Sequence, residues 1–249
     1  IKMAIDTEGM VRDIYLDNAR AADTCISPFT FGYYPADPPS FNLEKAKKLL
    51  TEAGWVDKGG ARVKDGKNLA LKIYSPPAGY HLMGGEVLLA IQESLRRVGF
   101  DCTVSISDYA AFTAEFYAKT LEQRTQEEKA EKRGDAHFID WGSRTDAWFT
   151  LKSRLHSGVW YPDKKGSIFY RNPEFDKLAD EAEVELDPQK RTELYKKAQI
   201  ILANDTPLVN LWVVNKTLVK RKYVQGLQYR PVSAEISHLD AREAWLDKR

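Results

Sequence analysis

The segments LALKIY (69–74), GEVLLAIQESLRRV (85–98) and DCTVSI (101–106) decide the fold class of this 249-residue chain. The first and third are short runs of strand-forming residues, whereas the apolar residues of the second recur three or four positions apart, as on one face of a helix. A strand, a helix and a strand in this order predict a βαβ unit with parallel strands. A helix from Asp108 onward and a strand over 136–141 continue the alternation. The sequence therefore predicts an α/β fold with a mainly parallel sheet flanked by helices, whose loops after successive strands lie along one edge.

The segments before this unit alternate between helix-forming and loop-forming residues. Apolar residues over 3–15 recur at helical spacing, and Asn42 is placed as the N-cap of a helix over 43–53, which Gly54 ends. Between these two helices, residues 18–40 are rich in proline and aromatic side chains. Proline fixes φ and lacks a backbone donor, so this segment predicts an extended loop.

Two helices after the unit are predicted by the same start signal, a capping side chain followed by proline, at Asn172 and at Asp187. We expect the apolar faces of both helices to pack on the sheet. These faces consist of Phe175, Leu178, Ala182, Leu194, Ala198, Ile201 and Leu202. The apolar run 208–214 predicts a buried strand, and the Gly- and Lys-rich residues 57–68 predict a turn.

The composition is that of a globular protein and excludes several functional classes. Hydrophobic residues make up 43% of the chain and aromatic residues 11%, which is too apolar for a disordered chain. The 37 basic side chains are balanced by 36 acidic ones, so the sequence indicates no partner among nucleic acids or membrane surfaces. Cys25 and Cys102 lack the CxxC spacing of a zinc or redox site. The sequence does not decide whether these two cysteines form a disulfide with each other. Residues 119–133 interleave acidic and basic side chains, which is typical of a solvated helix.

The common catalytic signatures are missing from the sequence. There is no GxSxG, GxGxxG, GxxxxGK[ST] or HExxH motif. The four histidines are scattered and lack the i,i+4 spacing of a helical metal site; they are His81, His137, His156 and His238. The sequence therefore predicts no enzyme, no metal and no cofactor.

One segment, residues 138–161, is dense in aromatic and charged side chains. Trp141, Arg144, Asp146, Trp148 and Trp160 follow a predicted strand, and in open α/β sheets ligands bind beyond the carboxyl ends of strands. Flat apolar walls with two opposite charges suit a small polar ligand. Alternatively, Trp148 and Phe149 form the core face of a short helix, and Arg144 pairs with Asp146. The residue types leave both interpretations open.

The order of these features along the chain resembles the carboxyl-terminal half of the family 5 extracellular solute-binding proteins, the dipeptide and oligopeptide receptors of bacterial ABC importers. The most recognisable stretch is YPADPPSFNLEKAKKLLTEAGW (34–55). The other matching stretches occur in family order, at 4–11, 95–100, 140–142, 156–158, 170–176 and 187–203. Each is moderately specific, and together they span nearly the whole chain.

The resemblance implies a bilobal, monomeric receptor that closes on its solute and delivers it to a membrane permease, without catalysing a reaction. Residues 1–213 would form one periplasmic-binding-protein-like lobe. Residues 214–249 would cross the hinge toward the other lobe, which precedes this chain together with the export signal. The resemblance also implies a location in the periplasm or on the outer cell surface.

The sequence departs from that of the peptide-binding receptors at one informative position. In those receptors an aspartate three positions after the tryptophan of this segment holds the α-ammonium group of the ligand; here that position is Arg144. Either Asp146 supplies the carboxylate, or Arg144 binds a carboxylate, phosphate or other anionic group. The predicted cleft residues are Trp141, Arg144 and Asp146, with Tyr33, Trp148 and Trp160 as further candidates. Two other classes stay open: an α/β enzyme that uses a His and an Asp from separate loops, and a sensor or chaperone module on the same lobe.

Overall fold

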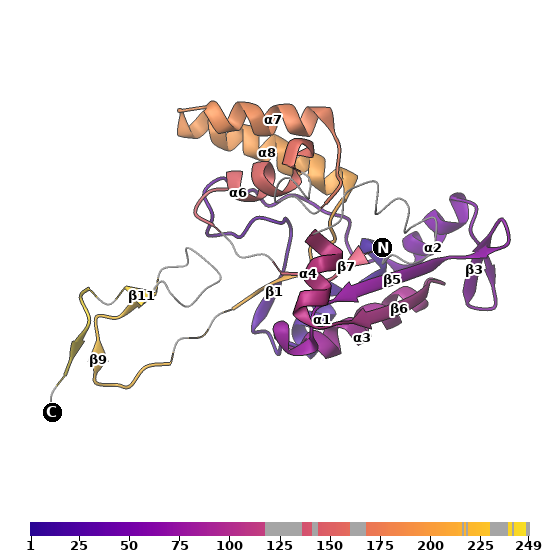
Figure 1. Cartoon of the computed structure of the whole chain (residues 1–249), viewed down its shortest axis with the longest axis horizontal. Coiled ribbons are helices and arrows are strands. Elements are labelled where there is room, and N and C mark those ends of the chain that lie inside the picture. The colour runs from indigo at the N-terminus through magenta and orange to yellow at the C-terminus, as the bar shows by residue number, and fades with distance from the viewer. Residues whose placement is uncertain are drawn as a thin grey trace.

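The computed structural model describes most of the chain. The described residues are 1–117, 136–140, 144–159, 168–215, 217, 219–229, 239–240 and 242–247. Most of them form two units, each with its own hydrophobic cluster, and a tail of short hairpins extends away from both (Figure 1). We call the two units the sheet unit and the helical unit.

The sheet unit is built on three parallel strands, β5 (Ala70–Ser75), β6 (Asp101–Ile106) and β7 (Ala136–His137), in the order β6-β5-β7. The crossover from β5 to β6 contains the helix α3 (Gly84–Arg96), and α4 (Tyr109–Tyr117) follows β6. The predicted parallel α/β sheet is thus confirmed. Of the strand predicted over 136–141, the described part is shorter, and Trp141 lies outside the described residues.

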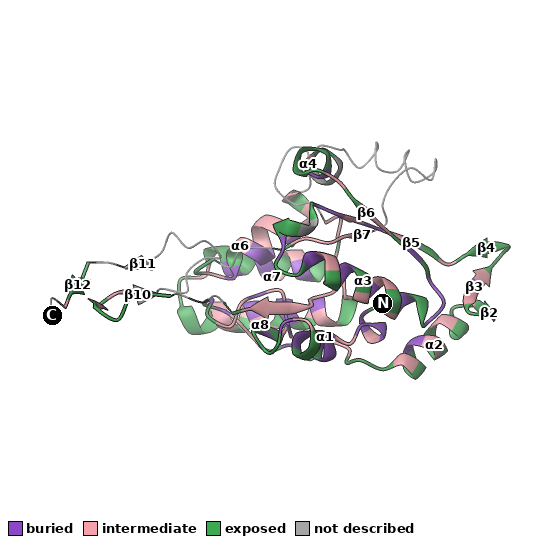
Figure 2. Cartoon of the chain, turned by 90° about the horizontal axis from the view of Figure 1, so that it is seen from below, coloured by how far each residue is buried: buried purple, intermediate pink, exposed green. Residues whose placement is uncertain are grey.

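The core of the sheet unit lies between the sheet and the inner face of α3. Val87, Leu88 and Leu95 of this helix and Cys102 of β6 are fully buried, and buried residues recur along α3 in Figure 2. Burial of each large apolar side chain contributes about 1.5–3 kcal/mol. Cys102 and Cys25 are both free thiols, so these two cysteines do not form a disulfide with each other.

The helical unit consists of α7 (Pro173–Val184), α8 (Pro188–Asp205), the short helix α6 (Trp148–Thr150) and a π-helical turn, η3 (Leu151–Leu155). Both predicted caps are confirmed, because the side chains of Asn172 and Asp187 accept hydrogen bonds from backbone N–H groups of the first turns. The short connection makes α7 and α8 an antiparallel pair.

The predicted packing of α7 and α8 on the sheet is wrong. Phe175 and Ala182 of α7 pack with Tyr195 and Ala198 of α8, and with Leu151 and Leu155 of η3 and Ile26. The two helices and η3 present their apolar faces to one another. They therefore form a second core without the sheet.

The first fifty residues and the predicted turn also differ in detail from the prediction. Residues 3–15 form the turn η1 (Lys2–Ala4) and the helix α1 (Thr7–Asp13), because Ile5 is extended and Asp6 caps a new helix. The helix α2 (Leu43–Glu52) begins after Asn42, as predicted. Residues predicted as a turn form an antiparallel sheet of β2 (Val56–Lys58), β3 (Ala61–Lys64) and β4 (Lys67–Asn68).

Arg62 explains why this small sheet is ordered. Its guanidinium is buried and donates to the carbonyl oxygens of Val98 (2.9 Å) and Trp55 (2.8 Å) and to the hydroxyl of Thr51 (3.0 Å). These charge-assisted bonds tie β3 to the ends of α2 and α3.

The remaining strands join distant parts of the chain. The segment predicted as a loop over 18–40 contains β1 (Ala19–Ala21), which pairs antiparallel with β8 (Trp212–Val214). The strand β8 is half-buried, whereas the sequence predicts a buried strand. The pairing makes residues 212–214 part of the body of the molecule.

The tail beyond β8 contains two short antiparallel pairs, β9 (Val224–Gln225) with β12 (Trp245–Leu246) and β10 (Gln228–Tyr229) with β11 (Leu239–Asp240). Every described residue of the tail whose burial is given is exposed or half-buried, which Figure 2 shows by the absence of purple in this part of the ribbon. Among the described residues, no helix combines the length and apolar character that crossing a membrane requires.

Candidate functional site

The candidate site lies beyond the carboxyl ends of the three parallel strands. In open α/β sheets this edge binds ligands, because the loops after neighbouring strands converge there. The backbone N–H of Phe138 donates to the carbonyl of Tyr74 (2.8 Å), so β7 stays beside β5 as it leaves the sheet. The chain then passes through Asp140 to Arg144 and enters the helical unit. The site therefore lies at the connection through which the chain passes from the sheet unit to the helical unit.

Hydrogen bonds to the backbone hold Arg144 and its neighbour Thr145 in place. The Arg144 carbonyl oxygen accepts a hydrogen bond from Thr30 Oγ1 (2.9 Å), and next to it Phe31 N donates to the carbonyl of Thr145 (3.0 Å). The guanidinium lies over the ring of Phe149, with 4.8 Å between Cζ and the ring centroid. Arg144 is exposed, and no carboxylate of the described residues pairs with it. The geometry thus offers a positioned cation to solvent.

Asp146 has three internal hydrogen-bond donors. Its Oδ1 accepts from Tyr195 Oη (2.7 Å) and from the backbone N of Trp148 (2.9 Å), and its Oδ2 accepts from Arg191 Nη2 (3.0 Å). Burial, and then the bond to Asp146, raises the pKa of Tyr195. The alternative pairing of Asp146 with Arg144 is wrong, because Arg191 of α8 takes that place. Asp146 therefore fastens the loop to the helical unit, and serving a ligand would mean giving up these bonds.

Trp148 lies at the surface of the helical unit. It is 37% exposed, and its Nε1 donates to Glu183 of α7 (3.1 Å). The prediction of Trp148 on the core face of a short helix is wrong, because Ala147, Leu151 and Leu155 are the residues of this segment that are buried.

Tyr33 is half-buried and bonded within the protein. Its hydroxyl donates to Asp23 Oδ2 (2.6 Å) and accepts from Arg20 Nη2 (3.3 Å). Burial and the neighbouring Asp23 raise the pKa of Tyr33. Of the other predicted cleft residues, Trp141 and Trp160 lie outside the described residues, as does the charged segment 119–133.

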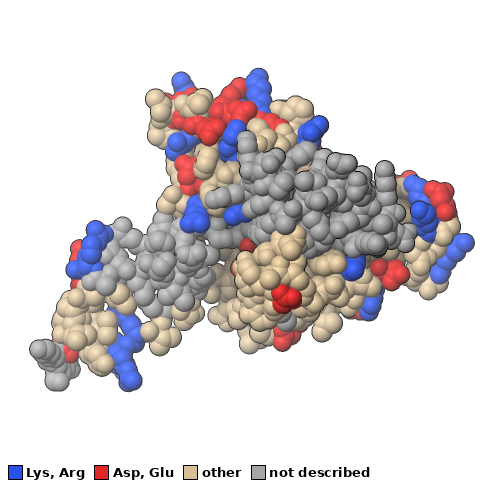
Figure 3. All heavy atoms as spheres, viewed as in Figure 1, with Lys and Arg blue, Asp and Glu red and all other residues tan. Residues whose placement is uncertain are grey.

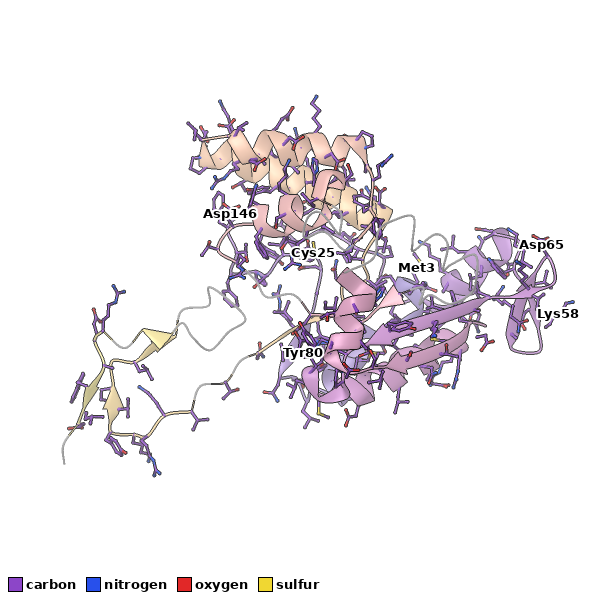
Figure 4. All side chains as sticks on the ribbon, viewed as in Figure 1. Met3, Cys25, Lys58, Asp65, Tyr80 and Asp146 are labelled. Atoms are coloured by element: carbon purple, nitrogen blue, oxygen red, sulfur yellow. The ribbon has the colours of Figure 1, made fainter. Side chains whose placement is uncertain are left out.

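The sequence analysis missed four residues at this edge: Tyr80, His81, Tyr109 and Asp140. Each follows one of the three parallel strands, which is the signal that could have identified them. Figure 4 shows Tyr80 at the base of α4, on the sheet unit, and Asp146 on the helical unit. The site thus has aromatic side chains, Tyr80 and Tyr109, on the side of the sheet unit. Its cation, Arg144, lies on the connection to the helical unit.

A second group of charged side chains in the helical unit is bonded within the fold. His156 Nδ1 accepts from the backbone N of Gly158 (2.8 Å), and its Nε2 lies 3.2 Å from Asp180 Oδ1. Asp180 also bonds Lys152, and these interactions lower the pKa of Asp180. Acidic side chains gather over this unit in Figure 3. Within the described ranges, no group of three His, Cys, Asp or Glu side chains is arranged to hold a metal ion.

Comparison with known proteins gives a consistent result. The profile of a family described as "Bacterial extracellular solute-binding proteins, family 5 Middle" matches residues 1–162. The oligopeptide-binding protein AppA of Bacillus subtilis is 24% identical over 236 residues, which cover 92% of this chain and 40% of AppA. The glutathione-binding protein GsiB of Salmonella choleraesuis is 24% identical over 232 residues, which cover 93% of this chain and 41% of GsiB.

A solved structure shares the fold. The structure of AppA in complex with a nonapeptide superposes with a TM-score of 0.75 at 23% identity, over 99% of this chain and 46% of AppA. The predicted resemblance is therefore confirmed, and the chain spans less than half the length of the relatives it matches.

Proposed function

This chain belongs to the family 5 bacterial extracellular solute-binding proteins, and on that basis we propose that it forms one lobe of a receptor for an ABC importer. The lobe binds one side of a peptide or similar small polar solute, and a second lobe closes over the other side. The loaded receptor delivers the solute to the membrane subunits of the importer. In this scheme the chain carries out no reaction and uses no cofactor.

The observation that carries the proposal is the position of Arg144. It lies between the carboxyl end of β7 and the helical unit, its carbonyl is bonded by Thr30, and its guanidinium rests on Phe149. A planar guanidinium binds a carboxylate with two parallel hydrogen bonds and repels an ammonium group. We infer that Arg144 binds an anionic group of the solute, such as the terminal carboxylate of a peptide.

The other predicted cleft residues keep lesser roles in this proposal. Trp141, Trp148 and Trp160 would supply apolar contacts, while Tyr33 and Asp146 would shape the cleft through their internal hydrogen bonds. Residues 1–213 would form the lobe and residues 214–249 would return across the hinge. We propose a monomeric receptor in the periplasm or on the outer cell surface, which is where proteins of this family work.

The test is a binding experiment on the protein expressed from its complete reading frame. The protein is incubated with a peptic digest of casein, and the retained peptides are identified by mass spectrometry, synthesised and titrated by calorimetry. We expect Arg144→Ala to weaken binding of these peptides by about 1.5–3 kcal/mol, the contribution of a charged hydrogen bond.

Arg97→Ala is the matched control. Arg97 is exposed, pairs only with Glu93 on its own helix among the described residues, and follows α3 at the opposite edge of the sheet. Its replacement should leave affinity unchanged. Equal affinity of Arg144→Ala and wild type would exclude the role of Arg144, and the absence of any retained solute would overturn the receptor function.

A further inference from the structure

Two arginines of the segment that leads into the helical unit rest on one aromatic ring. The Cζ atoms of Arg144 and Arg154 lie 4.8 Å and 5.3 Å from the ring centroid of Phe149. A guanidinium group is attracted to the face of an aromatic ring. Because both distances end at the same ring, the two cations are no farther apart than the two distances combined. Phe149 thus places two positive charges within reach of one small solute.

A π-helical turn brings Arg154 to this ring. In η3 (Leu151–Leu155) the backbone hydrogen bonds join residues five positions apart, whereas an α-helix joins residues four apart. Phe149 and Arg154 are separated by the same five positions. The side chains of Leu151 and Leu155 are fully buried and hold the turn against the core of the helical unit. Single π-turns are rare in proteins and are frequent at functional sites.

The described carboxylates near this segment are bonded to other donors. Asp146 accepts three hydrogen bonds within the helical unit. On α7, Asp180 and Glu183 both pair with Lys152. Arg144 is exposed and forms no ion pair with the residues that the structure describes. The positive charge at the ring is therefore available to an anion from outside the fold.

Two neighbouring cations favour an anion with more than one charge. Like charges repel each other, and a solute with two negative charges removes this repulsion when it binds. The planar guanidinium group forms paired hydrogen bonds with a carboxylate and with a phosphoryl group alike. A solute with a single carboxylate at Arg144 would make no use of the second cation.

We propose that Arg144, Phe149 and Arg154 form a subsite for an end of the solute that carries at least two negative charges. Arg144 binds the terminal carboxylate of a peptide, and Arg154 binds a second oxyanion on the last residue, either a phosphoryl group or a side-chain carboxylate. This inference rests on the proposed receptor function and narrows it to solutes that are multiply anionic at one end.

The experiment uses four forms of each peptide retained from the casein digest, which differ only in the last residue. The phosphoserine and glutamate forms carry the second oxyanion, and the serine and glutamine forms are their neutral counterparts. Calorimetry on the protein from the complete reading frame gives the affinity for each form. For the wild type we expect about ten- to hundredfold tighter binding of a charged form than of its counterpart, the range of a charged hydrogen bond. A preference in only one of the two pairs identifies the second oxyanion as phosphoryl or carboxyl.

The variants of Arg154 test its part in this preference. Arg154→Gln should abolish the preference and leave the affinity for the serine and glutamine forms unchanged, because Arg144 still binds the terminal carboxylate. Arg154→Lys keeps the charge without the planar fork and should reduce the preference without abolishing it. Arg97→Gln is the matched control, since it makes the same change at the exposed Arg97, whose preference should equal that of the wild type. Thermal unfolding of each variant shows that the fold is intact.

The aromatic ring is tested separately. Phe149→Leu keeps an apolar side chain but removes the ring on which both guanidinium groups rest. We expect about two- to tenfold weaker binding of the preferred charged form. Phe41→Leu, at an exposed phenylalanine that precedes α2, is the control and should bind as the wild type does.

The outcomes separate the two proposals. If the wild type binds charged and neutral forms equally, or if both Arg154 variants keep the full preference, the subsite is overturned while the receptor function stands. If the wild type retains no peptide, the receptor function for peptides fails, and the subsite fails with it.

Discussion

The two units treat their polar side chains in opposite ways. In the helical unit these groups are bonded internally: Asp146 accepts from three donors, and Gln199 bonds Thr24, Tyr34 and Gly32. At the carboxyl edge of the sheet unit, Asp140 is exposed beside two half-exposed tyrosines. Polar groups that satisfy each other stabilise a fold, whereas a ligand needs groups that the fold leaves open. The comparison shows that the polar groups of the helical unit are engaged by the fold, whereas those at the sheet edge are open to solvent.

The largest expected effect tests whether the helical unit has a core of its own. Phe175 is fully buried between α7, α8 and η3, so Phe175→Ala should lower the free energy of unfolding by about 3–5 kcal/mol. Val184→Ala on the same helix, at a residue that is 75% exposed, should change it by less than about 0.5 kcal/mol. Urea denaturation measures both, and a similar small change for both would contradict a separate helical core.

The second prediction makes one substitution in both regions. Asp146→Asn replaces an acceptor by an amide group that faces donors, and we expect a loss of about 1–3 kcal/mol in stability. Asp140→Asn, at an exposed carboxylate, should change stability by less than about 0.5 kcal/mol. Chemical denaturation of the two variants measures this. Equal destabilisation by both substitutions would remove the distinction between an aspartate that the fold engages and one that it leaves exposed.

The smallest expected effect concerns pH and the sheet edge. Burial lowers the pKa of His81 below its ordinary value of 6.5, and the nearby Asp140 charge offsets this in part. The unfolded chain therefore takes up a proton at a higher pH than the folded protein does. The contribution of neutral His81 to stability is present above pH 6.5 and is lost as the pH falls through the lowered pKa.

His81→Phe tests this contribution, because phenylalanine keeps an aromatic ring against Tyr80 and Phe138 but cannot titrate. We expect the decrease of the melting temperature between pH 7 and pH 5 to be smaller in this variant than in the wild type, as measured by circular dichroism at each pH. An identical decrease in both proteins would show that another group is responsible.

The local features of the fold are predictable from sequence because they depend on neighbouring residues. Asn42, Asn172 and Asp187 cap helices through bonds to N–H groups two or three positions away, so each cap is visible in a short stretch of sequence. The strand–helix–strand order likewise predicts the parallel sheet. The packing of α7 and α8 was not predictable, since an apolar helix face does not specify which apolar surface covers it.

The candidate site is predictable only in part, for the same reason. Arg144 is identifiable from its place after a strand and in a segment that resembles the family. Tyr80, Tyr109 and Asp140 are far apart in the sequence, and they lie at one edge of the sheet only because their strands are neighbours in the order β6-β5-β7. No spacing rule in the sequence brings these three residues together.

The sequence by itself determined the fold class, the helix caps, the family and the presence of a cation at Arg144, because each is encoded in contiguous residues. Only the tertiary structure decided which aspartate is engaged by the fold and which is open. Asp146 meets Arg191 and Tyr195 across 45 and 49 residues of chain, and these contacts exist only after α8 has folded onto the loop. The charge of a side chain is a property of the sequence, but its availability to a ligand depends on the partners that folding brings to it.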